Sequence, residues 1–104
     1  MATRCSIIVD GIDTVKVYKH WDGNPESTLE WLQVFNKDFT DNRGFDNPEY
    51  KIAQLLRSSA RDAKVYGLDP SKHTGWGILP IDNDAGEEFI YFLHADGSVT
   101  VNNN

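Results

Sequence analysis

The sequence predicts one α+β domain, in which two helices pack on one face of an antiparallel sheet of about five strands. Two observations support this. Short segments with strand character and Gly-containing turns lie at both ends of the chain, and two longer segments between them repeat apolar residues at helical spacing. A chain of 104 residues has room for one core only. We therefore expect residues 1–104 to form a single domain in the order ββααβββ.

The N-terminal part of the chain begins with a predicted hairpin over residues 4–9 and 14–20. Asp10-Gly11, between the two segments, is a strong two-residue turn signal. In the second segment valines alternate with polar residues, which is typical of a strand with one buried and one wet face. We expect Cys5, the only cysteine, to be an inert buried thiol on the first strand.

A repeated start signal predicts the two helices. Asn24-Pro25-Glu26 and Asn47-Pro48-Glu49 each combine an N-cap asparagine, a proline at the first helical position and an acid in the first turn. Apolar residues at core spacing follow each signal, and Gly67 is expected to end the second helix as a left-handed cap. They are Leu29, Leu32, Phe35 and Phe39, flanked by Trp31 and Val34, and then Ile52, Leu55, Leu56, Ala60 and Ala63.

Three further strands are predicted after the helices, over residues 75–81, 89–93 and 98–101, and residues 102–104 are expected to fray. Asp96-Gly97 marks the turn of the last hairpin, and the Asp-, Asn- and Gly-rich residues 82–88 read as a turn. Residues 89–93 are apolar on both faces, so the second face of the sheet also needs a cover. We expect a homo-oligomer to provide it, with cover by strand twist and residues 75–81 of the same chain as the alternative.

Composition limits the classes of function. The chain is 39% apolar and 25% charged, which is a globular composition, and without an apolar leader or a membrane span we expect a cytoplasmic protein. The net charge of -6 disfavours direct binding of nucleic acid but allows the protein to occupy a basic groove on a partner. The three histidines are not at metal-ligand spacing, so we expect neither a metal nor a cofactor.

The densest group of functional residue types lies at the predicted junction of a strand and a helix, where backbone N–H groups are unsatisfied. Tyr18 and Trp21 are candidates for ligand binding, with Trp21 stacking on a base or a sugar. His20 and Asp22 are also candidates for ligand binding. They are the only catalytic candidates as well, because together they could act as an acid–base pair. The alternative is a structural corner, in which Asp22 bonds the turn, Gly23 takes a positive φ and Trp21 fills the core.

Two other groups are binding candidates. Thr74 and Trp76 belong to a His-Thr-Gly-Trp-Gly run that starts at His73 and suits a binding lip with a flat aromatic face. Arg57 and Arg61 share one helix face and match the oxygens of phosphate or carboxylate groups. The alternatives are a strand entry with Trp76 in the core, and a solvated helix face whose arginines pair with nearby acids.

The run Tyr18-Lys19-His20-Trp21-Asp22-Gly23-Asn24-Pro25-Glu26 resembles a family of small uncharacterised prokaryotic and bacteriophage proteins. Their shared feature is a Tyr-x-His-Trp-Asp-Gly-x-Pro-Glu motif after an N-terminal hairpin, and Asn24 stands where many of them have an aromatic residue. Asn47-Pro48-Glu49-Tyr50-Lys51 and Thr74-Gly75-Trp76-Gly77 are similar to other parts of the pattern. The resemblance implies a compact α+β fold and an origin in prokaryotes or their phages, without an agreed activity.

Three functions stay open at this point. The first is a non-enzymatic, phage-derived counter-defence protein that sequesters a small nucleotide-like or anionic ligand. The second is an acidic inhibitor or adaptor of a basic, nucleic-acid-binding protein. The third is a small hydrolase that uses His20 and Asp22. The ligand-binding residues of the first hypothesis are Tyr18, His20, Trp21, Asp22, Arg57, Arg61, Thr74 and Trp76.

Overall fold

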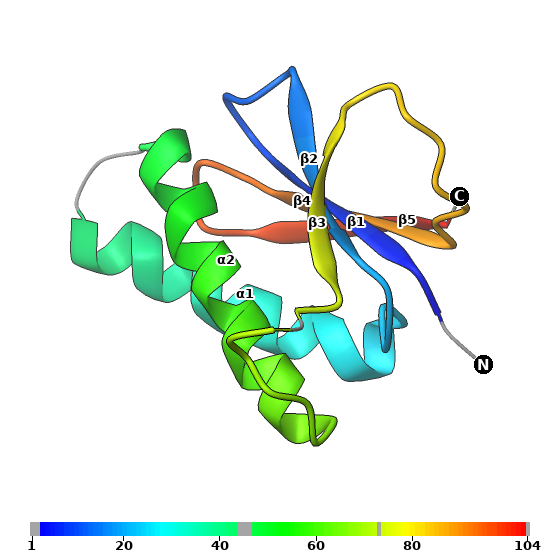
Figure 1. Ribbon diagram of the computed structural model, residues 1–104. Coiled ribbons are helices and arrows are strands. Elements are labelled where there is room, and N and C mark those ends of the chain that lie inside the picture. Colours follow the sequence, from blue (N-terminus) through cyan, green and yellow to red (C-terminus); the bar gives the residue numbers. More distant parts are fainter. Residues whose placement is uncertain (1–2, 44–46, 73, 104) are drawn as a thin grey trace.

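The computed structural model describes residues 3–43, 47–72 and 74–103, and these residues form the predicted order ββααβββ. Figure 1 shows both helices on the same side of the sheet, which confirms the α+β class and the helix layer. The elements are β1 (Cys5–Val9), β2 (Val15–Lys19), α1 (Pro25–Arg43), α2 (Pro48–Val65), β3 (Trp76–Pro80), β4 (Phe89–Leu93) and β5 (Val99–Asn103).

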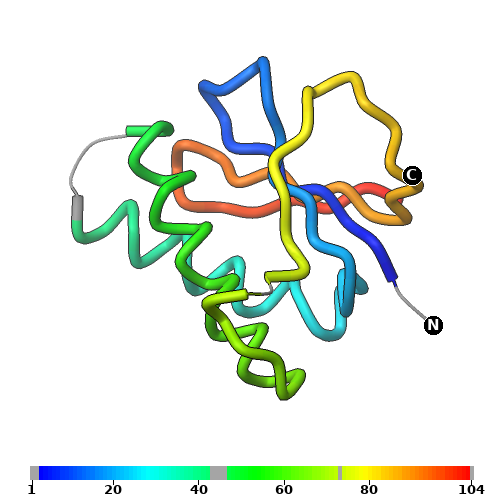
Figure 2. The backbone as a smooth tube through the Cα atoms, in the orientation of Figure 1, coloured from blue at the N-terminus to red at the C-terminus, as the bar shows by residue number. Residues whose placement is uncertain are grey.

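The strands form a five-stranded sheet in the order β3-β2-β1-β4-β5. The prediction of an antiparallel sheet was wrong for one pair, because β1 and β4 run parallel, with Ile7 opposite Tyr91. Parallel neighbours cannot be joined by a tight hairpin and need a crossover connection. The chain between β1 and β4, residues 10–88, makes this connection, and its last part, residues 81–88, crosses from the edge strand β3 to β4 on the far side of β1 (Figure 2). Their Asp, Asn and Gly content had indicated a turn, yet it suits a crossover loop equally well.

The helices cover the face of the sheet that carries the main apolar core. On this face α1 packs against β4 and β5, and α2 packs against β1. Burial raises the pKa of the Cys5 thiol to about 12, so the thiol is inert at neutral pH, as the sequence predicted. The buried side chains of this core are Cys5, Ile7, Val9, Val17, Leu32, Leu55, Trp76, Tyr91 and Leu93.

The crossover loop, residues 81–88, covers part of the opposite face of the sheet. Its Glu87 side chain is buried, accepts a hydrogen bond from the Ser6 hydroxyl and forms an ion pair with Lys16 at 2.5 Å. The Lys16 ammonium also donates to the carbonyl of Asn83 at 2.6 Å. Part of the second face is therefore covered by the chain itself, through residues 81–88, whereas most of the predicted segment 75–81 forms the edge strand β3. Self-association stays a prediction.

The helix start signals are confirmed, since α1 begins at Pro25 and α2 at Pro48. Gly67 has a φ of +73°, as expected for a left-handed residue after the end of α2. Two strand boundaries differ from the prediction. The first hairpin is joined by residues 10–14 instead of a two-residue turn, and β5 extends to Asn103, which pairs with Phe89. The predicted fraying is therefore wrong for residues 102–103, and residue 104 lies outside the described residues.

Candidate functional site

Four of the predicted site residues lie together at the end of β2 and the corner that follows it. The Tyr18 hydroxyl is 2.8 Å from Nδ1 of His20, and the His20 ring meets Trp21 edge-on, with ring centroids 5.0 Å apart. Trp21 also contacts Tyr66 at the C-terminal end of α2, at 5.6 Å between centroids. The Tyr66 hydroxyl donates a hydrogen bond to the carboxylate of Asp22. We call Trp21, Asp22 and Tyr66, with the Leu68 that follows, the aromatic corner.

The geometry of this corner differs from both interpretations of the sequence. His20 and Asp22 have different hydrogen-bond partners, so they do not form an acid–base pair. Asp22, instead of Gly23, takes the positive φ, at 55°. Gly23 is needed for close packing, because a Cβ there would lie 2.7 Å from the Cβ of Cys5. Trp21 is 37% exposed and does not fill the core.

Of the residues in the second predicted group, Thr74 lies next to the aromatic corner and Trp76 does not belong to it. Gly75 packs beneath the Trp21 ring, because a Cβ at Gly75 would lie 2.5 Å from that ring. Trp76 is buried in the core, and its indole N–H donates to Asp62 at 2.9 Å. The alternative interpretation, a strand entry with Trp76 in the core, is therefore confirmed. His73, from the same run, lies outside the described residues.

The two arginines of the third group lie on α2 and do not join the aromatic corner. The Arg57 guanidinium donates to the Gln54 side chain at 3.2 Å. Arg61 lines a hollow between the helices, and this hollow shares no residue with the hollow at the aromatic corner. Both arginines are exposed, and neither forms an ion pair within the described part of the chain. The eight predicted residues therefore do not form one pocket.

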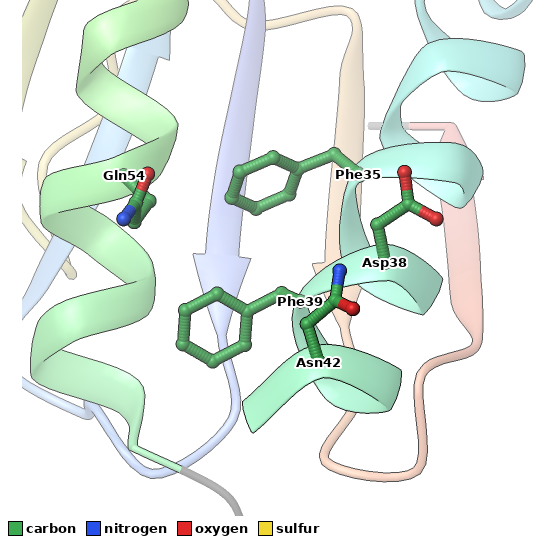
Figure 3. Close-up of a pocket in the computed structure, with 5 residues that line it drawn as sticks. All are labelled: Phe35, Asp38, Phe39, Asn42 and Gln54. Atoms are coloured by element: carbon green, nitrogen blue, oxygen red, sulfur yellow. The ribbon is translucent and has the colours of Figure 1, made fainter. Parts of the chain in front are cut away.

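Two adjoining hollows lie between α1 and α2, and we call them together the interhelical groove. The first has a volume of about 270 Å³, and Figure 3 shows Phe35 and Phe39 pointing from α1 toward α2, which carries Gln54. The second has a volume of about 540 Å³ and shares Phe35 with the first. The lining residues are Phe35, Asp38, Phe39, Asn42 and Gln54 in the first, and Glu26, Ser27, Glu30, Trp31, Val34, Phe35, Ser58 and Arg61 in the second.

The floor of the interhelical groove is aromatic. Trp31, Phe35 and Phe39 follow one another at four-residue spacing, which places them on one side of α1. The rings of Phe35 and Phe39 are stacked, with centroids 6.3 Å apart and an interplanar angle of 28°. Beside them Val34 is 56% exposed, which is unusual for a helix position that lines a concave surface. This floor can receive apolar side chains of another molecule.

The two walls of the groove differ in charge. The α1 wall carries the carboxylates of Glu26, Glu30 and Asp38, whereas the α2 wall carries neutral side chains and Arg61. Glu26 accepts a hydrogen bond from Asn24 at 2.9 Å. Glu30 and Asp38 are exposed, and neither makes an ion pair with a side chain in 3–42, 47–72 or 74–103. The groove therefore joins an apolar floor to exposed carboxylates.

The sequence contained a signal for the groove, but the spacing of its floor residues is also that of core residues, as which we predicted them. Apolar residues span more of the α1 circumference than contact with a sheet requires, and the structure divides them into two stripes. Leu32 lies in the buried stripe beneath α1, while Trp31 and Phe35 lie beside it and line the groove. Tyr66 and Leu68 were missed, because no motif links the end of α2 to the run after β2.

Among the residues that the structure describes, no three His, Cys, Asp or Glu side chains are grouped so that they could hold a metal ion. Neither helix described there is long and apolar enough to cross a membrane. A comparison of the chain with protein-family models, with curated proteins and with solved structures finds no match.

Proposed function

We propose that the protein is a non-enzymatic inhibitor or adaptor, which holds a basic segment of a partner protein in the interhelical groove. The observation that supports this most strongly is the aromatic floor of the groove beside two exposed carboxylates, those of Glu30 and Asp38. Neither carboxylate forms an ion pair with a described side chain. A basic amphipathic segment complements both features. Its apolar side chains contact the floor, and its lysines or arginines meet the carboxylates of α1.

The dimensions of the groove suit a helical segment. The groove follows α1 from Glu26 to Asn42, a length of about 24 Å at the rise of an α-helix. A partner helix of about four turns, or an extended segment of about seven residues, spans that length. Because Arg61 lies on the α2 wall, the basic side of the segment faces α1.

The net charge of -6 strengthens association with the same class of partner. Proteins that bind nucleic acid present basic surfaces to phosphate, and an acidic protein can occupy such a surface in place of the nucleic acid. The resemblance of the Tyr18 to Glu26 run to prokaryotic and phage proteins suggests a context for this role. We propose that the protein acts in the cytoplasm, in phage counter-defence, against a nucleic-acid-binding effector.

Sequestration of a nucleotide-like or anionic ligand is the second candidate. It is supported by Arg61 and Trp31, which line the same hollow of about 540 Å³, so that a base could stack on the indole while the arginine binds a phosphate. Glu26 and Glu30 line that hollow as well and repel a phosphate. This repulsion places the anionic ligand second. The hydrolase hypothesis has no such support, because His20 and Asp22 are not paired.

The primary test uses three synthetic peptides of about 16 residues. The first places leucines at positions i, i+3, i+4 and i+7 and lysines beside them, the second scrambles the same residues, and the third replaces lysine with glutamate. We expect calorimetry to detect binding of the first peptide alone, with an affinity that falls as salt rises. Equal binding of all three, or binding that is indifferent to salt, would contradict the proposal.

Variants locate the binding site on the protein. The Glu30→Lys/Asp38→Lys double variant should weaken binding of the lysine peptide by at least about tenfold. Asp13→Lys/Glu88→Lys changes the net charge equally at exposed positions that do not line the groove, and it should have a much smaller effect. If an anionic ligand is the true target, the groove variant should instead tighten binding of nucleotides.

A further inference from the structure

The aromatic corner contains a hollow that is separate from the interhelical groove. It has a volume of about 220 Å³ and is lined by Trp21, Tyr66 and Leu68. The two aromatic rings contact each other at a tilt of 53°, with centroids 5.6 Å apart, and both line this recess together with Leu68. Trp21 and Tyr66 are 37% and 38% exposed, and the recess is therefore accessible from solvent.

A carboxylate is bonded to one of the residues that line this recess. The Asp22 carboxylate accepts a hydrogen bond from Tyr66 and makes no ion pair within the described residues. Tyr66 is also the C-cap of α2, and the last carbonyls of a helix carry partial negative charge. A buried cation lies nearby, because Lys19 donates to the carbonyls of Trp21 and Asp22. Its charge is balanced by Asp62 at 3.5 Å, so the Asp22 charge stays available.

The backbone holds Trp21 in place. Asp22 follows it with a φ of 55°, a conformation that non-glycine residues rarely adopt. Gly75 has a φ of +67°, and the Trp21 indole packs directly against it, in space that a Cβ at this position would need. The His20 ring meets the indole edge-on, at an interplanar angle of 82°. The indole is thus partly exposed and is held by contacts with Gly75 and His20, as a preorganised binding surface requires.

We infer that the aromatic corner binds an alkylammonium cation, such as a quaternary ammonium or a methylated amine. The faces of Trp21 and Tyr66 attract a cation, and its alkyl groups pack against the rings and Leu68. Asp22 supplies the opposite charge and repels a phosphate. The cation has two possible sources with the same chemistry, a free small molecule or a trimethylated lysine of a protein. The inference does not depend on the interhelical groove.

The test follows the indole N–H resonances of the labelled protein by NMR during titration with tetramethylammonium, choline and 3,3-dimethylbutan-1-ol, a neutral molecule of the same shape as choline. We expect the Trp21 resonance to shift saturably with both cations and at least about tenfold more weakly with the alcohol. Trp76, which is buried and bonded to Asp62, serves as the internal reference. Equal responses to choline and the alcohol, or no saturable shift, would overturn the inference.

Variants and a peptide complete the test. Trp21→Leu should weaken choline binding by at least about tenfold, while Tyr50→Leu, at an exposed tyrosine outside the hollow, should leave it unchanged. Asp22→Asn keeps a residue that tolerates the left-handed backbone, and should weaken choline binding several-fold. Unchanged affinity in Asp22→Asn, with the fold intact by circular dichroism, would also overturn the inference.

Tighter binding of a trimethyllysine peptide than of choline identifies a protein side chain as the source, and the reverse order identifies a free molecule.

Discussion

Two sets of carboxylates in this protein have opposite environments. Glu87 is buried by the crossover loop and is held by Lys16 and Ser6, so its charge is used within the fold. Glu30 and Asp38 lie along the interhelical groove, exposed and without ion pairs within the described chain. The comparison separates charge that stabilises the protein from charge that is available to another molecule.

The pKa of Glu87 reflects how completely its charge is compensated. Burial by itself raises this pKa, but the hydrogen bonds from Lys16, Ser6 and the backbone N–H of Ala85 outweigh burial. They lower the pKa to about 2, from an ordinary value of 4.5. The folded protein therefore stabilises the ionised carboxylate.

The largest effect is expected from Glu87→Ala, which leaves Lys16 buried without its carboxylate partner. We expect a loss of about 4 kcal/mol in the free energy of unfolding, as is typical when one member of a buried pair is removed. Denaturant titration measures it, and Glu88→Ala is the matched control, because the Glu88 side chain is exposed. A similar loss in both variants would show that the loop, and not the Glu87 charge, is the source of the effect.

The next effect is a dependence of stability on pH. Because the pKa of Glu87 is lower in the folded than in the unfolded protein, the unfolded state binds more protons between the two values. The contribution is fully present above a pH of about 5 and is lost as the pH falls toward about 2, with a total of about 3 kcal/mol. Unfolding experiments on the parent protein and Glu87→Gln should show that this slope is much reduced in the variant. An identical slope in both would assign the acid sensitivity to other groups.

The smallest effect on stability is expected in the groove. Glu30→Gln/Asp38→Asn should change the free energy of unfolding by less than about 0.5 kcal/mol, since neither carboxylate takes part in an ion pair of the described chain. The same variant should clearly weaken binding of the lysine peptide. A large loss of stability would mean that these charges belong with Glu87 as structural groups.

The local signals in the sequence predicted the elements well. The two Asn-Pro-Glu runs located both helix starts, and alternation in β2 located the first hairpin. The parallel pairing of β1 and β4 could not be predicted, because it depends on where residues 81–88 lead the chain and not on their composition. For the same reason the sequence could not show that Trp76 faces the core while Trp21 stays at the surface.

The candidate groove was harder to predict than the fold. Phe35 and Phe39 have the spacing of core residues, and only the folded structure shows that both line a hollow next to α2. In the sequence Glu30 and Asp38 look like ordinary acidic residues on a helix surface. Only the structure shows that they lie beside the aromatic floor of the groove. Arg57 and Arg61 have helical spacing but take no part in the aromatic corner.

The most direct test of the central claim is a charge swap at the groove. Glu30→Lys/Asp38→Lys is titrated with the lysine peptide and with its glutamate counterpart, in parallel with the parent protein. We predict that the parent binds the lysine peptide and rejects the glutamate peptide, and that the variant reverses this preference. A variant that keeps the preference of the parent would show that the groove does not receive the basic segment.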